Sequence, residues 1–196
     1  EMHTTLYLRL RELCLGEFRI DYNTVVDKET GEPVEKQTIR FEPGDRSSTI
    51  DEIRSIMAEH GKDEHWIILT HSRKWAEKAA IDLGGKAYTG NQSIAQKEQL
   101  KDDFLAGKVK VLVGTEAMSE GLDGLQHVCR NAIVASRPPS FKTNQFLGRI
   151  ARRGQKRPVN AWEIIREDSI DVGIVAKKIA LVLQNNKAKS VDKREC

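Results

Sequence analysis

From Trp66 onward, short apolar segments alternate with longer helical patterns, and this alternation limits the fold more than any other feature of the chain. Strands are predicted at WIILT, KAYTG, KVLVGT, NAIVAS and VNAWEIIRE. Helices are predicted at RKWAEKAAIDLGG, at SIAQKEQLKDDFLAGK and around QFLGRIARRGQ. Strands that alternate with helices of roughly 10–15 residues indicate a parallel sheet. We therefore expect an α/β fold in which helices cover both faces of a parallel sheet.

The first 61 residues follow a different pattern of a helix, a hairpin and a second helix. Leucines among arginines predict a helix that ends near Gly16, and two alternating arms around DKETGEP predict a β-hairpin over residues 18–41. SSTIDEIRSIMAEHG predicts a helix with Ser48 and Asp51 at capping-box spacing, so that Ser48 is the expected cap, and the helix stops at Gly61.

These patterns predict three parts of the chain. Residues 1–61 hold the first helix, the hairpin and a linking helix, residues 62–184 form the α/β part, and residues 185–196 form a tail. The α/β part closes with a helix over SIDVGIVAKKIALVLQNN. We expect the tail to be disordered because it has no apolar period.

Composition excludes several classes of protein. A net charge of +3 permits nucleic-acid binding without requiring it. Cys14, Cys129 and Cys196 are far apart and form no CxxC pair, which argues against a metal site or a disulfide framework and favours a reducing cytoplasm. No apolar run reaches the roughly 20 residues that a membrane-spanning helix needs, so no membrane partner is expected. The chain begins without methionine inside a helical pattern, so we expect it to be a piece of a longer protein.

Three loops are expected at one edge of the sheet, because ligands of open α/β sheets gather beyond the carboxyl ends of the strands. They are HSR, GTEAMSEGLDGLQ, and the segment from NAIVASRPPS into QFLGRIARRGQ. The second loop offers backbone N–H groups and the Thr115 hydroxyl to a phosphate. In the third, Arg149 and Arg152 are three residues apart, so on a helix their side chains leave on the same side. A guanidinium binds phosphate oxygens as a fork, so the pair is interpreted as an anion clamp; a solvated basic face is the alternative.

GTEAMSEGLDGLQ followed by QFLGRIARRGQKRP resembles motifs V and VI of superfamily-two helicases. The Q-x-x-G-R-x-x-R-x-G-Q form is similar to the Swi/Snf-type branch of DNA translocases. LRELC resembles the L-R-x-x-C segment of that branch, and SSTIDEIRSIM resembles its lobe-linking helix. WIILTHS resembles motif IV, YTGNQS a D-G-x-x-S-like segment, and VNAWEIIREDSID the closing strand. The resemblance covers nearly all of residues 1–184, and the hairpin most resembles phage and bacterial members.

The resemblance implies a RecA-like fold and a split ATPase site, with ATP between two lobes of which this chain resembles the second. Arg149 and Arg152 match the arginine fingers that reach the γ-phosphate held by the first lobe. The residues that match nucleotide-binding positions are Gln145, Glu120, Gly121 and Asp123. Thr115 matches a residue on the nucleic-acid backbone, and the weaker candidates for that role are His71, Ser72, Thr89 and Gly90. Two departures affect the motif V loop: Met118 and Ser119 replace paired glycines, and Gly124 is added.

Nothing in the sequence matches a first lobe. Gly84-Gly85-Lys86 lacks the spacing of a GxxxxGK[ST] phosphate loop, and Asp51-Glu52 lies in a capped helix, not at the end of a strand. We therefore expect ATP and Mg²⁺ to be bound mainly by the first lobe of the same parent chain, and this fragment alone to be inactive. The parent is expected to be a nucleic-acid-stimulated ATPase that acts on double-stranded DNA in a bacterial or phage-infected cytoplasm.

Two other classes of function are alternatives to the helicase lobe. A dinucleotide-dependent enzyme would need GxGxxG after its first strand, and WIILTHSRKW contains none. A non-catalytic nucleic-acid-binding adaptor with the same fold stays as the alternative. His71 is either a plain hydrogen-bonding residue or a DNA contact, and Arg153, Lys156 and Arg157 are either nucleic-acid contacts or a solvated face. Burial in the core is expected for Trp66, Trp75, Trp162 and Cys129.

Overall fold

The computed structural model describes residues 10–16, 19–27, 30–40, 42–43, 47–137, 142–167, 169–170 and 172–173. Most of the expected last helix and the whole of the expected tail, residues 185–196, lie outside these residues. Among the residues that are described, no helix is both long and apolar enough to cross a bilayer.

Five parallel strands form the central sheet, in the order β4–β5–β3–β6–β7. The strands are β3 (Trp66–Leu69), β4 (Lys86–Tyr88), β5 (Val111–Gly114), β6 (Asn131–Val134) and β7 (Asn160–Glu163). Trp66 pairs with Val111 on one side and with Asn131 on the other. The predicted parallel sheet is therefore confirmed, with each predicted strand at its expected place.

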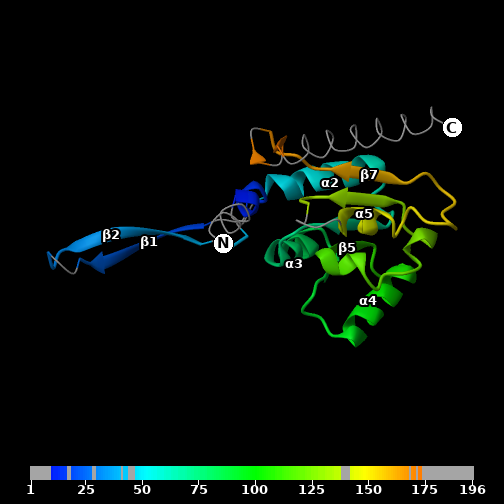
Figure 1. Cartoon of the computed structure of the whole chain (residues 1–196), viewed down its shortest axis with the longest axis horizontal. Helices are drawn as coiled ribbons and strands as arrows, with labels where there is room; N and C mark the ends of the chain where they lie inside the picture. The colour runs from blue at the N-terminus through cyan, green and yellow to red at the C-terminus, as the bar shows by residue number, and fades with distance from the viewer. Residues whose placement is uncertain are drawn as a thin grey trace, which may run out of the picture.

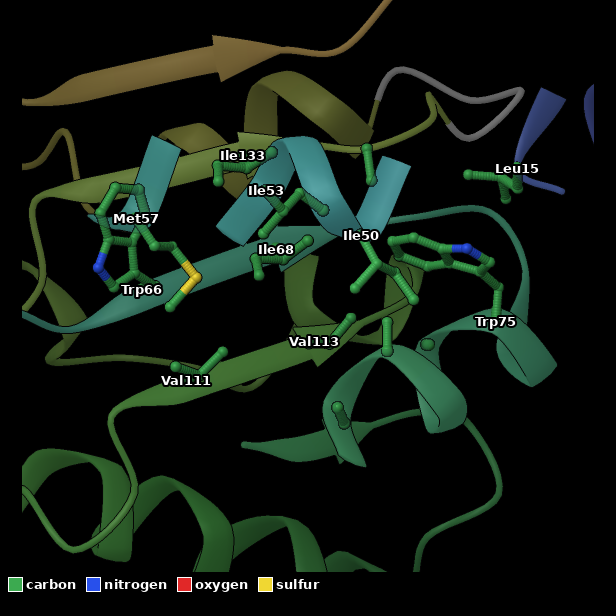
Figure 2. Packing of buried hydrophobic residues seen from close by; sticks show 14 residues of the cluster. Leu15, Ile50, Ile53, Met57, Trp66, Ile68, Trp75, Val111, Val113 and Ile133 are labelled. Atoms are coloured by element: carbon green, nitrogen blue, oxygen red, sulfur yellow. The ribbon is translucent and has the colours of Figure 1, made fainter. Parts of the chain in front are cut away.

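One face of the sheet packs against α2 (Ser48–His60) and α3 (Arg73–Asp82) (Figure 2). Alternate residues of β3 point to opposite faces, and Trp66 and Ile68 take this one. Ile53 and Met57 of α2 and Trp75 of α3 pack onto them. The predicted boundary at residue 61 stays a prediction, although α2 itself shares this core with the sheet.

The other face carries α4 (Ile94–Leu105) and α5 (Lys142–Leu147). Ile67 and Leu69 of β3 point here and pack with Phe104 of α4 and Phe146 of α5. All four side chains are fully buried. The expectation that helices cover both faces is confirmed, because each face has its own core.

The observed N-cap of α2 lies one residue before the predicted cap. The N-cap of α2 is Ser47, whose hydroxyl accepts a hydrogen bond from the amide of Ile50, so the helix does not start from the expected cap at Ser48. A complete capping box instead starts α4, where Ser93 and Gln96 satisfy each other's backbone amides.

The N-terminal hairpin is present as predicted. β1 (Arg19–Val26) and β2 (Pro33–Arg40) pair antiparallel and extend away from the sheet (Figure 1). Residues 10–14 are helical and precede the hairpin. On the far side of the hairpin, the Ser47 hydroxyl donates to the carbonyl of Leu15 at 3.1 Å. The segment that carries the hairpin therefore leaves the α/β part of the chain and returns to it at the same point.

Candidate functional site

The carboxyl ends of β5, β3 and β6 are neighbours, because these strands are adjacent in the sheet. The loops that follow them begin at Thr115, Thr70 and Ala135. The amide of Thr70 donates to the carbonyl of Gly114, and the amide of Ala135 donates to the carbonyl of Leu69. The structure thus brings together the three loops that the sequence placed at this edge.

The loop after β5 is held by the residues that depart from the family pattern. It forms two short 3₁₀ turns, η1 (Glu116–Ser119) and η2 (Leu125–His127). Met118 is fully buried in the core beneath it, and the Ser119 hydroxyl donates to the carbonyl of Lys142 at 3.0 Å. The added Gly124 has a φ of 90° and caps η2 in the left-handed region, which favours glycine. The loop is therefore anchored by side chains where paired glycines were expected.

Arg149 and Arg152 converge on one carboxylate. Nη1 of Arg149 lies 2.8 Å from Oδ1 of Asp123, and Nη1 of Arg152 lies 2.7 Å from the same oxygen. The Nε and Nη2 atoms of Arg149 both donate to the carbonyl of Ser119. The Asp123 side chain is 72% exposed, whereas those of Arg149 and Arg152 are 15% and 47% exposed. The two guanidinium groups thus meet at an anionic oxygen on the open edge of the domain.

The prediction that a helix carries these arginines is wrong. α5 ends at Leu147, and Arg149, Arg152 and Arg153 follow in turns. Gly148, directly after the helix, and Gly154, with a φ of 99°, bound this turn segment. The arginines face the same way because Asp123 and Ser119 hold them, not because of helical periodicity.

Lys142, which the sequence reading missed, joins the loop after β5 to the start of α5. Its Nζ lies 2.8 Å from the Glu120 carboxylate and 3.7 Å from that of Glu116. The hydrogen bond from Lys142 and its positive charge lower the pKa of Glu120, and the hydrogen bond from Glu120 raises the pKa of Lys142. Both side chains are consequently charged at neutral pH.

His71 lies in a buried polar cluster at the end of β3. Its Nδ1 is hydrogen-bonded to the hydroxyl of Ser136, and Nη2 of the fully buried Arg11 donates to the same hydroxyl at 3.3 Å. The Ser136 hydroxyl therefore accepts a hydrogen bond from the arginine and can donate its own proton to Nδ1 of the imidazole. Burial, with the nearby charge of Arg11, lowers the pKa of His71 to about 3. The imidazole is therefore neutral and serves as a hydrogen-bonding group in this state.

Replacing His71 by glutamine is expected to reduce the loss of stability in mild acid. The folded pKa of about 3 lies below the unfolded value of 6.5, so between these pH values the unfolded chain binds a proton that the folded chain does not. Stability therefore falls as the pH drops below 6.5, by up to about 1.4 kcal/mol per pH unit. Urea unfolding at about pH 7 and about pH 5 should show the unmodified chain losing roughly 1–2 kcal/mol more than His71→Gln. Equal losses in the two proteins would show that folding does not lower the pKa of His71.

The other predicted contact residues divide into buried and accessible ones. Ser72 is buried and caps α3 by accepting from the amide of Trp75 at 3.3 Å, and Thr89 is buried with its amide bound to Gln92. The accessible ones are Thr115, half-buried, and Gly90, Gly121 and Gln145, all exposed. Their roles stay predictions, but accessibility favours the second group.

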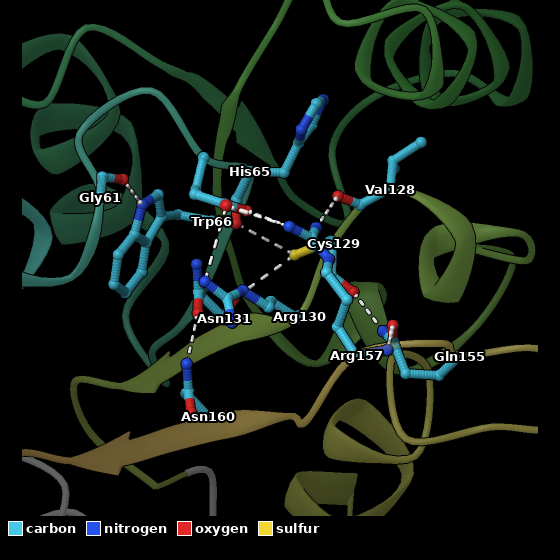
Figure 3. A network of polar contacts seen from close by, with 11 residues as sticks. Gly61, His65, Trp66, Val128, Cys129, Arg130, Asn131, Gln155, Arg157 and Asn160 are labelled. Atoms are coloured by element: carbon cyan, nitrogen blue, oxygen red, sulfur yellow. Dashed lines mark hydrogen bonds and ion pairs between the residues drawn. The ribbon is translucent and has the colours of Figure 1, made fainter.

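At the opposite, amino edge of the sheet, Arg157 has a structural partner. Its Nη1 lies 3.0 Å from both carboxylate oxygens of Glu64, and its Nη2 donates to the carbonyl of Val128 (Figure 3). The buried Cys129 packs in the same network, where burial raises the pKa of its thiol to about 12. Arg157 is thus tied to the fold and is not part of a fully solvated face.

Residues 48–154, more than half of the chain, match the family model of the helicase conserved C-terminal domain. The chain belongs to this family. The matched range contains the loop after β5 together with Arg149, Arg152 and Asp123. The predicted superfamily-two C-terminal lobe is therefore confirmed, and its assignment to the Swi/Snf-type branch stays a prediction.

A curated relative of this helicase C-terminal domain is the pre-mRNA-splicing ATP-dependent RNA helicase PRP28 of Debaryomyces hansenii. It is 28% identical over 116 residues, which cover 54% of the chain and 19% of the relative. The chain thus spans about a fifth of the length of this relative.

Solved helicase structures share the fold of the helicase C-terminal domain. The C-terminal part of the Fun30 ATPase domain superposes with a TM-score of 0.58 at 22% identity, covering 67% of this chain and 45% of that one. Dbp5 of S. cerevisiae, bound to RNA and ADP BeF3, gives a TM-score of 0.56 at 19% identity over 66% of this chain and 34% of that one. The sheet and its helices are therefore a RecA-like lobe, as predicted.

Proposed function

We propose that this domain is the second lobe of an ATP-dependent DNA translocase of the Swi/Snf type. In this proposal, a first lobe of the same parent chain binds ATP and Mg²⁺, and Arg149 and Arg152 complete the ATPase site. The observation that carries the proposal is the meeting of both guanidinium groups at one oxygen of Asp123.

The Asp123 carboxylate fits the position of a temporary anion. An ion pair with an exposed carboxylate contributes only about 0–1 kcal/mol. The arginines can therefore release Asp123 and bind another anion at little cost in free energy. A γ-phosphate carries more negative charge than a carboxylate and offers three oxygens to a guanidinium fork. The residues therefore fit a nucleotide phosphate. Two cationic groups at the same point disfavour a divalent cation there, so the proposal assigns the Mg²⁺ ligands to the first lobe.

The accessible residues of the same edge define the rest of the proposed site. Gln145 is exposed on α5, three residues before Gly148, where the turn segment that carries the arginines begins, and would face the lobe interface with Glu120 and Gly121. Thr115 begins the loop after β5, and no hydrogen bond from its side chain caps η1. Its hydroxyl is therefore suited to a backbone phosphate, with Gly90 on the neighbouring loop.

The proposal predicts weak and salt-sensitive binding of the domain to duplex DNA. Phosphate contacts release counterions, so the logarithm of the affinity should fall linearly as the logarithm of the salt concentration rises. Fluorescence anisotropy with labelled DNA duplexes of unrelated sequence measures this, and Thr115→Ala should weaken binding several-fold.

An RNA duplex of matching sequence and the variant Thr38→Ala, in the distant hairpin, are the controls. Tighter binding to RNA than to DNA would contradict the DNA assignment. Binding that depends on base sequence or ignores salt would contradict the proposed mode of contact. A parent protein that binds DNA but hydrolyses no ATP would support the adaptor alternative.

A further inference from the structure

A pocket of about 690 Å³ lies at the amino edge of β4 and β5, across the sheet from the arginines. Three segments line it: α2, the turn between α3 and β4, and the turn between α4 and β5. Its volume is in the range of pockets that bind ligands. Gly84 and Gly107 in the two turns have φ values of 67° and 76°, and a Cβ at either would meet no atom within 4 Å. The mouth of the pocket is therefore open beside both turns.

The pocket has apolar walls and a strongly basic lining. Met57 and Val111 are buried at its base, and Leu83 and Val109 add further apolar surface. Five of its residues are cationic: Arg54, Lys62, Lys86, Lys108 and Lys110. The one carboxylate is that of Asp82, which lies 3.0 Å from Nζ of Lys78 and is therefore already neutralised.

Arg54 and Lys108 are paired with Asp51 and Asp103 at 2.8 and 3.2 Å, whereas the other three cations are available to a ligand. Within the described part of the chain, no ion pair joins Lys62 or Lys86 to an acidic side chain. Lys110 lies 3.9 Å from the fully exposed carboxylate of Asp63, a contact that contributes little in water. The pocket thus carries unbalanced positive charge around an apolar base.

We infer that this pocket binds an acidic peptide segment that carries an apolar anchor side chain. The anchor fills the apolar base, and flanking carboxylates face Lys62, Lys86 and Lys110. A duplex backbone would use the lysines but leave Met57 and Val111 without a partner, because its phosphates are polar and it does not enter a pocket of this size. Four of the five cations are lysines, which attract carboxylates as point charges.

The test uses a fluorescein-labelled peptide in which glutamates flank one leucine. Fluorescence anisotropy with the chain should show saturable binding. Lys62→Glu combined with Lys86→Glu should weaken it at least roughly tenfold, since both cations are reversed. A peptide with serine in place of the leucine should also bind more weakly, which tests the apolar base without altering the protein core.

The matched control combines Lys101→Glu with Lys156→Glu, which changes the net charge equally outside the pocket. Circular dichroism confirms that each variant is folded, and the control should keep full peptide affinity. Equal weakening in both double variants, or no effect of the serine peptide, would overturn the proposal because the attraction would then be unspecific charge. Loss of labelled duplex DNA binding in Lys62→Glu/Lys86→Glu, with peptide binding unchanged, would overturn it in favour of a second nucleic-acid contact.

Discussion

Replacing either Arg149 or Arg152 by lysine is expected to lower kcat of the full-length parent about 10³-fold. Lysine keeps the positive charge but loses the planar fork, so the change tests geometry and not basicity. In the structure both guanidinium groups already hold the same anionic oxygen, Arg149 at 2.8 Å and Arg152 at 2.7 Å, whereas an ammonium on a flexible stem lacks the planar geometry of the fork. Nucleic-acid-stimulated ATP hydrolysis by the purified parent measures the effect, because the isolated second lobe is expected to have no turnover.

Arg153→Lys is the matched control, since Arg153 is exposed in the same turn segment. A phosphate clamp predicts two severe losses and one mild one, whereas a solvated basic face predicts three mild effects. Near-normal turnover in both Arg149→Lys and Arg152→Lys would end the assignment of these residues as fingers.

Arg149→Lys and Arg152→Lys differ in their expected effect on folding. Arg152 is half exposed and contacts only the exposed Asp123 carboxylate among its described partners, so its replacement should change stability by no more than about 0.5 kcal/mol. Arg149 is largely buried and also holds the carbonyl of Ser119, so its replacement should cost about 1 kcal/mol. Arg152→Lys therefore gives the cleaner test of catalysis.

Gly114→Ala is expected to destabilise the domain by about 3 kcal/mol. Gly114 ends β5, where the carbonyl oxygen of Tyr88 from β4 lies against the position that a Cβ would take. A methyl group there would clash with that oxygen and would lie 2.5 and 2.6 Å from Sδ and Cγ of the buried Met118. Neither neighbour can yield easily, because one is backbone of the sheet and the other fills the core. Urea unfolding followed by circular dichroism measures the loss.

Gly90→Ala is the control for this substitution. A Cβ at Gly90 meets no atom within 4 Å, so the change should alter stability by no more than about 0.5 kcal/mol. If Gly114→Ala were as stable as Gly90→Ala, the close approach of β4 to the end of β5 would be wrong.

The sheet could be predicted because its strands carry a strong local signal. WIIL is apolar at every position, since Trp66 and Ile68 fill one core while Ile67 and Leu69 fill the other. Parallel pairing then fixed which loops meet at the carboxyl edge. The meeting of Arg149 and Arg152 was also predicted, but from a helical spacing that the structure does not contain.

The features that the sequence did not predict depend on contacts between residues that are distant along the chain. Nothing local marks Asp123 as the group that orients two arginines 26 and 29 residues away. Likewise, Arg11 is separated by 125 residues from Ser136, which it contacts beside His71. Arg137 and Glu163, which form a bidentate pair between the ends of β6 and β7, gave no signal in the sequence. Spacing along the chain does not encode such contacts.

The contact between Leu15 and Ser47 makes the hairpin part of a closed loop that starts and ends at the same place on the lobe. Both ends of the intervening segment lie together on the lobe, and β1 and β2 pair with each other and not with the central sheet. Lengthening, shortening or exchanging this segment therefore leaves the path of the core chain unchanged. The hairpin can thus vary as a separate module while the helicase C-terminal lobe keeps its architecture.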